Sequence, residues 1–521
     1  MRSKRGRDMP METPCTQAGA RTARARRIAK LFPSVPRRDW AGLVMTFVIP
    51  CGVPLLLAVA MGIPLAVLIV KGQFHLVFAF LLLIPSVVLF NTYPLAALII
   101  WLLLAPFLQT TPNAAYRMVY WMVHRAMPVA ALGVAILSEL LRVTRNDSRK
   151  RRPIRLGRAE FVMVAYLGWA TLNILWFHPG PISYLYLLYD RVFVPMALYI
   201  LIRITAPDEQ DVWRLLPVAL VIVLIESIAG ILSWFAPQLL PPDWLGYQGA
   251  RTTGSLGYPH AYTTTLIFFS FLLFQAAMSR ESGPVRFVLF AVFGFSALCV
   301  FLSFSRGSWL GGLAAMVGLL VMYPKTVLRL MAVLLVLMAL LGSGVLSDQM
   351  AFARERMNSE DTAADRWVIW NAGLQMIKTQ PFFGWGYGNY RKYAQQFQVR
   401  THNHVVSYAH ASHNSYIAIA AEMGLPALAL FLFPAWWWLM LTRKVWRRIP
   451  QQGFWSRALL VILWMVILDH LVVNFFSDMQ HSTYGMGMWW VTLGLIANMV
   501  EGYLRSSDME LPAWLRRAAL S

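Results

Sequence analysis

The sequence predicts an all-α protein that crosses a membrane many times. Of its 521 residues, 58% are hydrophobic and only 13% are charged, whereas soluble domains carry about 25% charged residues. The apolar residues gather in blocks of roughly 18 to 25, the length that a helix needs to cross about 30 Å of hydrocarbon. A helix satisfies its own backbone in lipid, while a β-barrel would show alternating segments of about ten residues. We therefore expect a polytopic bundle of about 12–14 transmembrane helices.

About fourteen apolar blocks are long enough to serve as these spans. Pro50, Pro54 and Pro64 interrupt the first block, which therefore predicts either one kinked span or a re-entrant pair. A count of about twelve spans stays open as the alternative. The blocks are residues 41–70, 73–90, 92–109, 118–141, 159–177, 184–204, 213–236, 261–279, 286–304, 308–323, 328–346, 413–441, 457–475 and 484–503.

The net charge of +22, from 46 Lys and Arg against 24 Asp and Glu, is explained by the membrane prediction. Cytoplasmic loops of membrane proteins carry an excess of Lys and Arg, so no nucleic-acid partner is expected. Residues 1–38 hold 11 Lys and Arg and 2 acidic residues without an apolar run. They predict a basic cytoplasmic arm that can contact membrane lipids, rather than a signal peptide.

The basic loops set the expected topology. When spans are counted from a cytoplasmic arm, the loops 142–158 and 442–457, both rich in Lys and Arg, fall on the cytoplasmic side. The same count places four segments outside, namely 237–260, 303–308, 347–412 and 476–483. We therefore expect a basic cytoplasmic arm (1–38), an N-terminal transmembrane bundle (39–346), a large extracytoplasmic loop (347–412), C-terminal transmembrane helices (413–503) and a cytoplasmic tail (504–521).

The long outer segment contains its own helical pattern. Trp367, Trp370, Leu374 and Ile377 recur at helical spacing, which predicts an amphipathic helix lying on the membrane. Pro381 and the glycines of the sequence GWGYGNY then end that pattern, because Pro and Gly interrupt helices.

Three arginines on the predicted outer face are candidates for binding an anion. They are Arg251, Arg306 and Arg366, and basic residues are disfavoured on that side of a membrane. A guanidinium group matches the fork geometry of phosphate oxygens. A single arginine of this kind is more often one that reaches toward lipid phosphate. Three of them beside polar, glycine-rich loops favour an anion site.

His413 and Asn414 stand at the start of a predicted span. The free N–H groups and the dipole of a helix N-terminus favour an anion and disfavour an imidazolium ion. His413 is therefore expected to be neutral, as a general base must be. The alternative is an interfacial histidine that caps its own helix.

Further polar residues lie inside the predicted spans. Glu422 is a candidate functional carboxylate, with a structural pairing to His470 or Asn474 as an equal alternative. Arg191 is a candidate substrate contact, although the adjacent Asp190–Arg191 pair could bond elsewhere in the bundle. Glu226, near a bilayer midplane, is expected to form a buried hydrogen bond to a neighbouring helix.

Several common sites have no sequence signature here. The chain lacks a P-loop, a dinucleotide fingerprint, an HExxH motif and a G-x-S-x-G motif. Cys15, Cys51 and Cys299 fit neither a disulfide framework nor a metal site. We therefore expect no cofactor and no metal, and a substrate that is already activated or a transport gradient as the source of energy.

Together these motifs resemble the superfamily of O-antigen ligases and O-antigen polymerases. The ligase pattern appears as His413-Asn414, nine residues, and Gly424-Leu-Pro-Ala427, with alanine in place of the last glycine. The Arg-x-x-x-Leu pattern appears at Arg306, and ARTTGSLGYPH resembles the upstream segment with His260 where asparagine is common. The segment from Arg366 through GWGYGNY resembles the outer loop of the family.

The resemblance implies a fold, a reaction and a location. The fold is the GT-C-like all-helical bundle of O-antigen ligases with its long extracytoplasmic loop. The reaction is glycosyl transfer from an undecaprenyl-diphosphate-linked glycan, without a metal, at the periplasmic face of the bacterial inner membrane. Arg306 would be catalytic at the diphosphate, which Arg251 and Arg366 would help to bind, and His413 would be the base in an inverting displacement. Contacts to the substrate are expected from His260, Asn414 and Arg191.

The acceptor separates the activities that share this chemistry. A polymerase extends a lipid-linked repeat unit of O-antigen or exopolysaccharide, a ligase transfers glycan to a lipid A core, and a third relative glycosylates protein. The Gly-x-x-Ala sequence and the long loop favour the polymerase, for which a chain-length regulator is a candidate partner. A flippase for lipid-linked glycan and a non-catalytic glycan-lipid binder are the competing classes.

Overall fold

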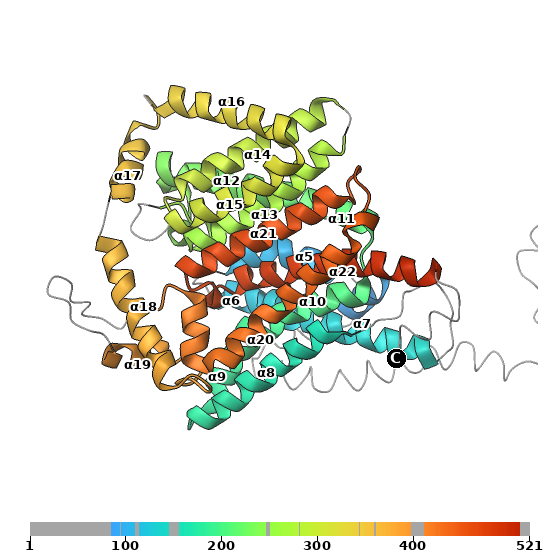
Figure 1. Ribbon diagram of the computed structural model, residues 1–521. Coiled ribbons are helices and arrows are strands. Elements are labelled where there is room, and N and C mark those ends of the chain that lie inside the picture. The colour runs from blue at the N-terminus through green and yellow to red at the C-terminus, as the bar shows by residue number, and fades with distance from the viewer. Residues whose placement is uncertain are drawn as a thin grey trace, which may run out of the picture. The chain divides into compact units, whose positions relative to one another are not determined.

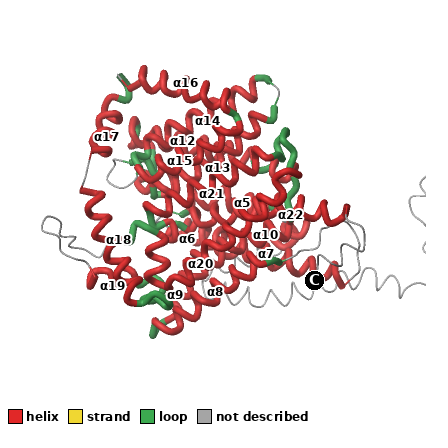
Figure 2. The backbone as a smooth tube through the Cα atoms, viewed as in Figure 1, coloured by secondary structure: helices red, strands yellow, loops and turns green. Residues whose placement is uncertain are grey.

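The computed structural model describes residues 85–93, 95–109, 114–144, 156–245, 251–280, 282–342, 344–358, 361–397 and 411–510. These residues fall within one compact unit, Leu82–Ser521. They contain helices, turns and loops but no strand (Figures 1 and 2), which confirms the all-α prediction. The predicted arm 1–38 and the first apolar block, 41–70, lie outside the described residues.

Eight helical segments in the described part of the chain are long and apolar enough to cross a membrane. They are Arg117–Leu141, Arg158–Phe177, Pro181–Thr205, Glu209–Phe235, Pro259–Met278, Pro284–Leu302, Ser415–Arg448 and Arg457–Phe476. A ninth candidate is the bent pair of Pro85–Thr92 and α5 (Ala96–Leu108). The chain is thus a polytopic helical membrane protein.

Helices occupy each predicted apolar block from 92–109 onward. The first half contains α6 (Ala114–Tyr120), α7 (Met127–Thr144), α8 (Arg158–Phe177), α9 (Pro181–Leu188), α10 (Val194–Thr205), α11 (Glu209–Trp213) and α12 (Leu216–Phe235). The second half contains α13 (Pro259–Met278), α14 (Pro284–Leu302), α15 (Arg306–Met322), α16 (Pro324–Gly342), α20 (Ser415–Val445), α21 (Arg457–Phe476) and α22 (Thr483–Glu510). The expected total of about 12–14 spans stays a prediction.

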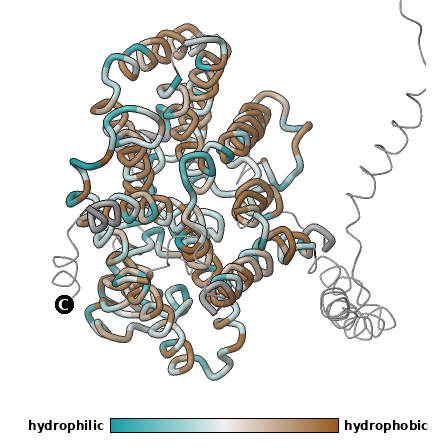
Figure 3. Tube along the Cα trace, turned by 90° about the vertical axis from the view of Figure 1, so that its right-hand side faces the viewer, coloured by the Kyte–Doolittle hydropathy of each residue, from teal (hydrophilic) through white to brown (hydrophobic). Residues whose placement is uncertain are grey.

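Helix α13 lies at the centre of the helices that follow α12. Of the residues in its most apolar stretch, 94% are buried. The helix packs against α12, α14, α15 and α21 (Figure 1). Other helices expose large apolar side chains, among them Trp176 at 84% and Ile182 at 81%. Figure 3 shows the same distribution, with hydrophobic residues along the helices and hydrophilic ones concentrated in loops. Such a surface fits hydrocarbon better than water.

The described residues of the segment 347–412 form helices and a docked turn. Helix α17 (Ser347–Asn358) is followed by α18 (Asp361–Thr379) and, after a turn, by α19 (Tyr390–Ala394). Helix α18 was predicted, but its protein-facing side is formed by Val368, Ile369, Ala372 and Met376, all buried. Trp367 is 67% exposed and Leu374 is 42% exposed, so these two predicted positions lie away from the buried side. The placement of this helix on the membrane stays a prediction.

The turn between α18 and α19 inserts against a break in α20. Gly424, inside α20, has φ 85°, and the N–H of Leu425 donates to the Pro381 carbonyl at 2.8 Å. A Cβ atom at position 424 would lie 2.0 Å from the Phe382 carbonyl oxygen. Glycine is therefore required there both by the positive φ and by the close approach of the loop.

The four segments predicted to share one face do lie together. Phe304 packs against Phe352 of α17 with ring centroids 4.9 Å apart, and Trp370 of α18 packs against Phe475 at 5.1 Å. His260 contacts the start of α15. We call this end of the bundle the loop end; it is formed by the described residues of 237–260, 303–308, 347–412 and 476–483.

Candidate functional site

His260 joins the start of α13 to the start of α15. It follows Pro259, which occupies the first position of α13, where proline is well tolerated. The His260 Nδ1 atom lies 3.1 Å from the hydroxyl oxygens of both Ser305 and Ser308. These two serines flank Arg306 in sequence, so the histidine is fixed to the turn that carries the arginine.

Three basic residues act electrostatically on the His260 ring. They are Arg366 of α18, Arg251 of the loop before α13, and His413 before α20. The structure thus brings residues from separate parts of the chain to one point. We refer to Arg251, His260, Arg306, Arg366 and His413 as the basic cluster. The charges that act on His260 are all basic, an arrangement suited to an anion.

The loop that carries Arg251 is held by a buried carboxylate. Glu226 of α12 accepts the N–H of Ser255 at 3.0 Å, and it also accepts the Ser255 hydroxyl. A Cβ atom on Gly254, whose φ is 53°, would lie 2.0 Å from the Glu226 carboxylate. The expected hydrogen bond of Glu226 is present, but it runs to this loop rather than to a neighbouring helix, and it fixes the backbone close to Arg251.

The backbone is strained next to two members of the basic cluster. In the described residues, the non-glycine residues with positive φ are Ala206, Phe304 and His413. Phe304 precedes the helix start at Arg306, and His413 is itself a candidate base; both have φ 49°. Such conformations cost of order 1–3 kcal/mol and persist where the surroundings impose them, often at functional sites.

Asp478 holds His413 in place. The His413 backbone N–H donates to the Asp478 carboxylate at 2.8 Å, and the Ser412 hydroxyl donates to the same group. The His413 Nδ1 atom lies 3.9 Å from an Asp478 oxygen, and the His413 side chain is 45% exposed. The sequence located Asp478 in the turn after α21 but did not indicate that it orients His413.

Asn414, rather than His413, caps α20. Its side-chain carbonyl accepts the N–H groups of Tyr416 and Ile417, both at 3.0 Å, as an N-cap residue does. The residue is 2% exposed. The alternative in which His413 caps its own helix is therefore wrong. The side-chain oxygen of Asn414 is already used as the acceptor of these two hydrogen bonds.

Glu422 has a structural partner that the sequence did not suggest. Its carboxylate accepts the backbone N–H of Tyr390 at 3.1 Å, so it holds the turn between α18 and α19. The pairing with His470 or Asn474 is wrong: His470 bonds to the carbonyls of Val466 and Gly485, and the Asn474 amide donates to the His470 carbonyl.

Arg191 lies beside a pocket. Its guanidinium donates to the Nδ1 atom of His481 at 2.5 Å, which requires that nitrogen to be unprotonated. Although part of His481 is exposed, the surrounding protein and then the charge on Arg191 lower the pKa of His481 to about 4. The adjacent Asp190 pairs with Arg125 at 2.6 Å, so the two neighbours bond in different directions.

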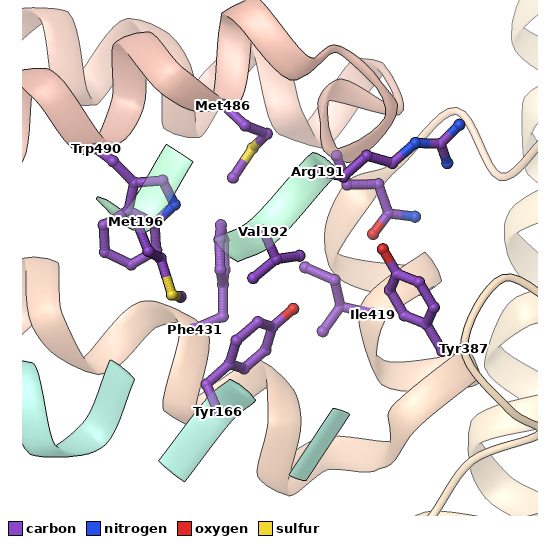
Figure 4. Close-up of a pocket in the computed structure, with 10 residues that line it drawn as sticks. Tyr166, Arg191, Val192, Met196, Tyr387, Ile419, Phe431, Met486 and Trp490 are labelled. Atoms are coloured by element: carbon purple, nitrogen blue, oxygen red, sulfur yellow. The ribbon is translucent and has the colours of Figure 1, made fainter. Parts of the chain in front are cut away.

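The pocket beside Arg191 is small, with room for about one water molecule. Figure 4 shows aromatic rings of Tyr166, Phe431 and Trp490 around it, with Tyr387 and Arg191 on one side. Sequence periodicity gave no sign of this pocket, because its walls come from five separate regions of the chain. The described residues contain no group of three or more His, Cys, Asp or Glu able to hold a metal ion.

A comparison with known protein families matches a region that contains three members of the basic cluster. Residues 291–432 match the O-antigen ligase family; the match includes Arg306, Arg366 and His413 but begins after Arg251 and His260. A comparison with curated proteins gave no match. The family match confirms the resemblance seen in the motifs and supports a general role in polysaccharide ligation or polymerisation. Residues 291–432 of this membrane protein are thus similar to the O-antigen ligase family.

Proposed function

We propose that the protein is a glycosyltransferase that uses an undecaprenyl-diphosphate-linked glycan as donor. It transfers the glycan to a sugar hydroxyl at the loop end, on the periplasmic side of the inner membrane, and it polymerises repeat units. The observation that supports the proposal is that His260 bonds to the turn that holds Arg306 and lies within electrostatic reach of Arg251, Arg366 and His413.

The basic cluster suits the leaving group of this reaction. The bond between the anomeric carbon and the diphosphate oxygen breaks, and negative charge grows on the diphosphate. Guanidinium groups fixed where charge develops stabilise that transition state more than the ground state. Arg306 begins α15, and Arg251 and Arg366 supply charge from two other segments, so the three arginines can surround one diphosphate.

In this proposal, His413 removes the proton of the acceptor. As the acceptor oxygen bonds to the anomeric carbon, its proton passes to a neutral imidazole nitrogen. Asp478 lies 3.9 Å from Nδ1, so Nε2 is the nitrogen left to accept the proton, and the carboxylate stabilises the imidazolium that forms. A base oriented by a second group is the usual arrangement for activating a hydroxyl. One direct displacement inverts the anomeric configuration.

A reconstituted reaction tests the proposal. Purified protein in lipid nanodiscs is supplied with lipid-linked repeat units, with or without lipid A core, and the products are separated on a gel. A ladder from repeat units alone is expected. A product that forms only with lipid A core would assign the ligase activity, which the family description favours. No product with either acceptor, despite bound donor, would overturn the glycosyltransferase proposal.

Arg306 provides the sharpest variant for this assay. Arg306→Ala is expected to lower the rate by about 10²–10³-fold, the usual loss for one group that stabilises developing charge. Arg306→Lys keeps the charge but loses the planar fork, so we expect it to retain more activity than alanine. Excess chelator should leave the wild-type rate unchanged, and inhibition that a divalent ion reverses would contradict the metal-free mechanism.

A further inference from the structure

The docked turn between α18 and α19, residues 380–389, lies beside the middle of a membrane span. Helix α8 is apolar and has 20 residues, so it is about 30 Å long, which matches the thickness of the hydrocarbon. The indole ring of Trp169 stacks on the ring of Phe383 with centroids 5.3 Å apart. Trp169 and the end of α8 at Phe177 are separated by about 12 Å of helix rise. Phe383 therefore lies well below the level at which α8 ends.

The break in α20 gives the same depth for the turn. The N–H of Leu425 donates to the Pro381 carbonyl at 2.8 Å, and the N–H of Gly386 donates to the Glu422 carbonyl at 2.8 Å. These two α20 residues lie about 10–15 Å of helix rise beyond Ser415, where α20 begins. Measured along two spanning helices, the docked turn thus reaches the depth of the hydrocarbon.

Two aromatic side chains of the turn are exposed at that depth. Phe382 is 67% exposed and Phe383 is 60% exposed. Both adjoin exposed apolar side chains of the spans, namely Leu172, which is one helical turn from Trp169 on α8, and Leu425 on α20. The two phenylalanine rings therefore continue the apolar surface that the spans present to lipid.

Protein groups satisfy the backbone of the turn, as hydrocarbon requires. The amide nitrogen of Asn173, a buried residue of α8, donates to the Phe383 carbonyl at 2.7 Å. The amide oxygen of Asn173 accepts the N–H of Tyr387 at 2.8 Å. The indole N–H of Trp169 donates to the Met423 carbonyl, beside the break in α20, at 2.8 Å. A polar side chain inside a span calls for a function, and for Asn173 it is to clamp this turn.

We propose that residues 380–389 form a re-entrant loop, which enters the bilayer from the loop end, is held there by Asn173 and places Phe382 and Phe383 against the acyl chains of membrane lipids. Non-helical backbone is tolerated at this depth where protein covers it, and α8 and α20 cover it here. The loop anchors the end of α18, the helix that carries Arg366, and so fixes the height of that arginine relative to the lipid headgroups. The contact with lipid does not depend on the proposed reaction.

Nitroxide spin labels measure the depth of the loop. Full-length Phe382→Cys and Phe383→Cys are labelled in phospholipid vesicles, and the collisions of each label with oxygen and with a water-soluble nickel chelate are compared. Oxygen concentrates in hydrocarbon, whereas the chelate stays in water. Leu172→Cys is the control that faces lipid. Glu355→Cys is the control in water, because Glu355 is an exposed, charged residue of α17 and charge is disfavoured in lipid.

Both loop labels are expected to collide more with oxygen than with the chelate, as at Leu172, and the Glu355 label is expected to show the reverse. A preference for the chelate at both loop positions would overturn the proposal. So would few collisions with either reagent, because a protein partner would then cover the rings, and so would oxygen collisions that fall when undecaprenyl phosphate is added, because a prenyl chain would then be the occupant. The labelled chain carries serine at Cys15 and Cys51, and Cys299 is buried.

Asn173→Leu tests the clamp. It keeps α8 apolar but leaves the Phe383 carbonyl and the Tyr387 N–H unpaired in hydrocarbon, so we expect the label at Phe383→Cys to lose its preference for oxygen. Thr171→Val is the control, because the Thr171 hydroxyl bonds within α8, to the Leu167 carbonyl. An unchanged preference for oxygen in Asn173→Leu would overturn the role of the clamp. If Asn173→Leu fails to insert, the labels on the chain with native Asn173 still decide the depth of the loop.

Discussion

The charged residues around Arg203 and those around His260 are arranged in different ways. Arg203 is 8% exposed and pairs with Glu160 at 2.9 Å and with Glu501, while its guanidinium lies 5.0 Å from the centre of the Trp438 ring. The Glu160 carboxylate also accepts the Tyr199 hydroxyl at 2.7 Å. The positive charge of Arg203 is therefore paired with carboxylates of the same group.

The Arg203 group lies at the start of α8, the end of that helix that is remote from the docked turn. Glu160 is in its first turn, and Phe177, about 26 Å further along the helix, lies beside Gly386 of the docked turn. Around His260 the acting charges are all basic. Under the proposed function, the Arg203 group stabilises the bundle, whereas the basic cluster acts on the substrate. Changes in the first should alter stability, and changes in the second should alter activity.

The largest effect on activity is expected from His413→Ala. Loss of a general base typically lowers the rate by about 10²–10⁴-fold. Because the His413 side chain is 45% exposed, its removal should leave thermal stability in detergent close to that of wild type. Product formation on the gel measures the first quantity, and fluorescence-detected size exclusion after heating measures the second.

Asp478→Asn is the companion variant for His413. An amide can still accept the His413 backbone N–H, but it no longer stabilises an imidazolium, so a smaller loss than that of His413→Ala is expected. Full activity in His413→Ala would remove this residue as the base. A large loss of stability would instead place His413 with the structural group.

Arg203→Ala tests whether the Arg203 group stabilises the bundle. It leaves the buried Glu160 and the partly buried Glu501 without their common partner, and breaking a buried ion pair costs about 3–5 kcal/mol. The yield and melting temperature of the variant should fall, while the specific activity of the protein that folds should stay near wild type. Arg214→Ala is the control, because its pair with Asp211 is exposed and exposed pairs contribute about 0–1 kcal/mol.

A wild-type melting temperature in Arg203→Ala would show that this network does not stabilise the bundle. A fall in specific activity at constant stability would contradict the assignment more directly, because it would couple the Arg203 group to the reaction.

Gly424→Ala acts on the contact that connects α20 to the docked turn. The added methyl group would meet the Phe382 carbonyl oxygen at 2.0 Å at a φ of 85°, so the turn must shift or α20 must change its bend. We expect a loss of about 1–3 kcal/mol in stability together with reduced activity, because α18 carries Arg366 and leads into that turn. Gly453→Ala is the control for positive φ alone, since its φ is 96° and a Cβ there has open space. Equal effects in both variants would show that the docking contact adds nothing.

The sequence predicted the helices well because membrane spans are specified by long apolar runs, which need no knowledge of packing. The blocks at 261–279 and 457–475, for example, match α13 and α21 to within a few residues. The gathering of Arg251, Arg306, Arg366 and His413 also followed from the chain itself, since alternate spans return the loops to the same face.

The contacts within that face could not be predicted in the same way. The partners of His260 are Ser305 and Ser308, more than forty residues away, and nothing in hydropathy or charge marks these serines. Glu422 was a candidate for function because it is a carboxylate in a span, yet its partner is a backbone N–H of the docked turn. Such pairings depend on how the helices pack against one another, and the spacing of apolar residues along the sequence does not specify this packing.

Ala427→Gly should have the smallest effect and tests how the family signature is interpreted. Ala427 stands where ligases carry glycine, and this replacement favoured a polymerase in the sequence. In the structure Ala427 is fully buried within α20, three residues after the break at Gly424, and its methyl group is accommodated there. Glycine would cost about 0.5–1 kcal/mol of stability, and we expect less than about a twofold change in activity, with the same acceptor on the gel. A switch from a ladder to a core-dependent product would mean that this position selects the acceptor; an unchanged pattern would place acceptor choice elsewhere in the chain.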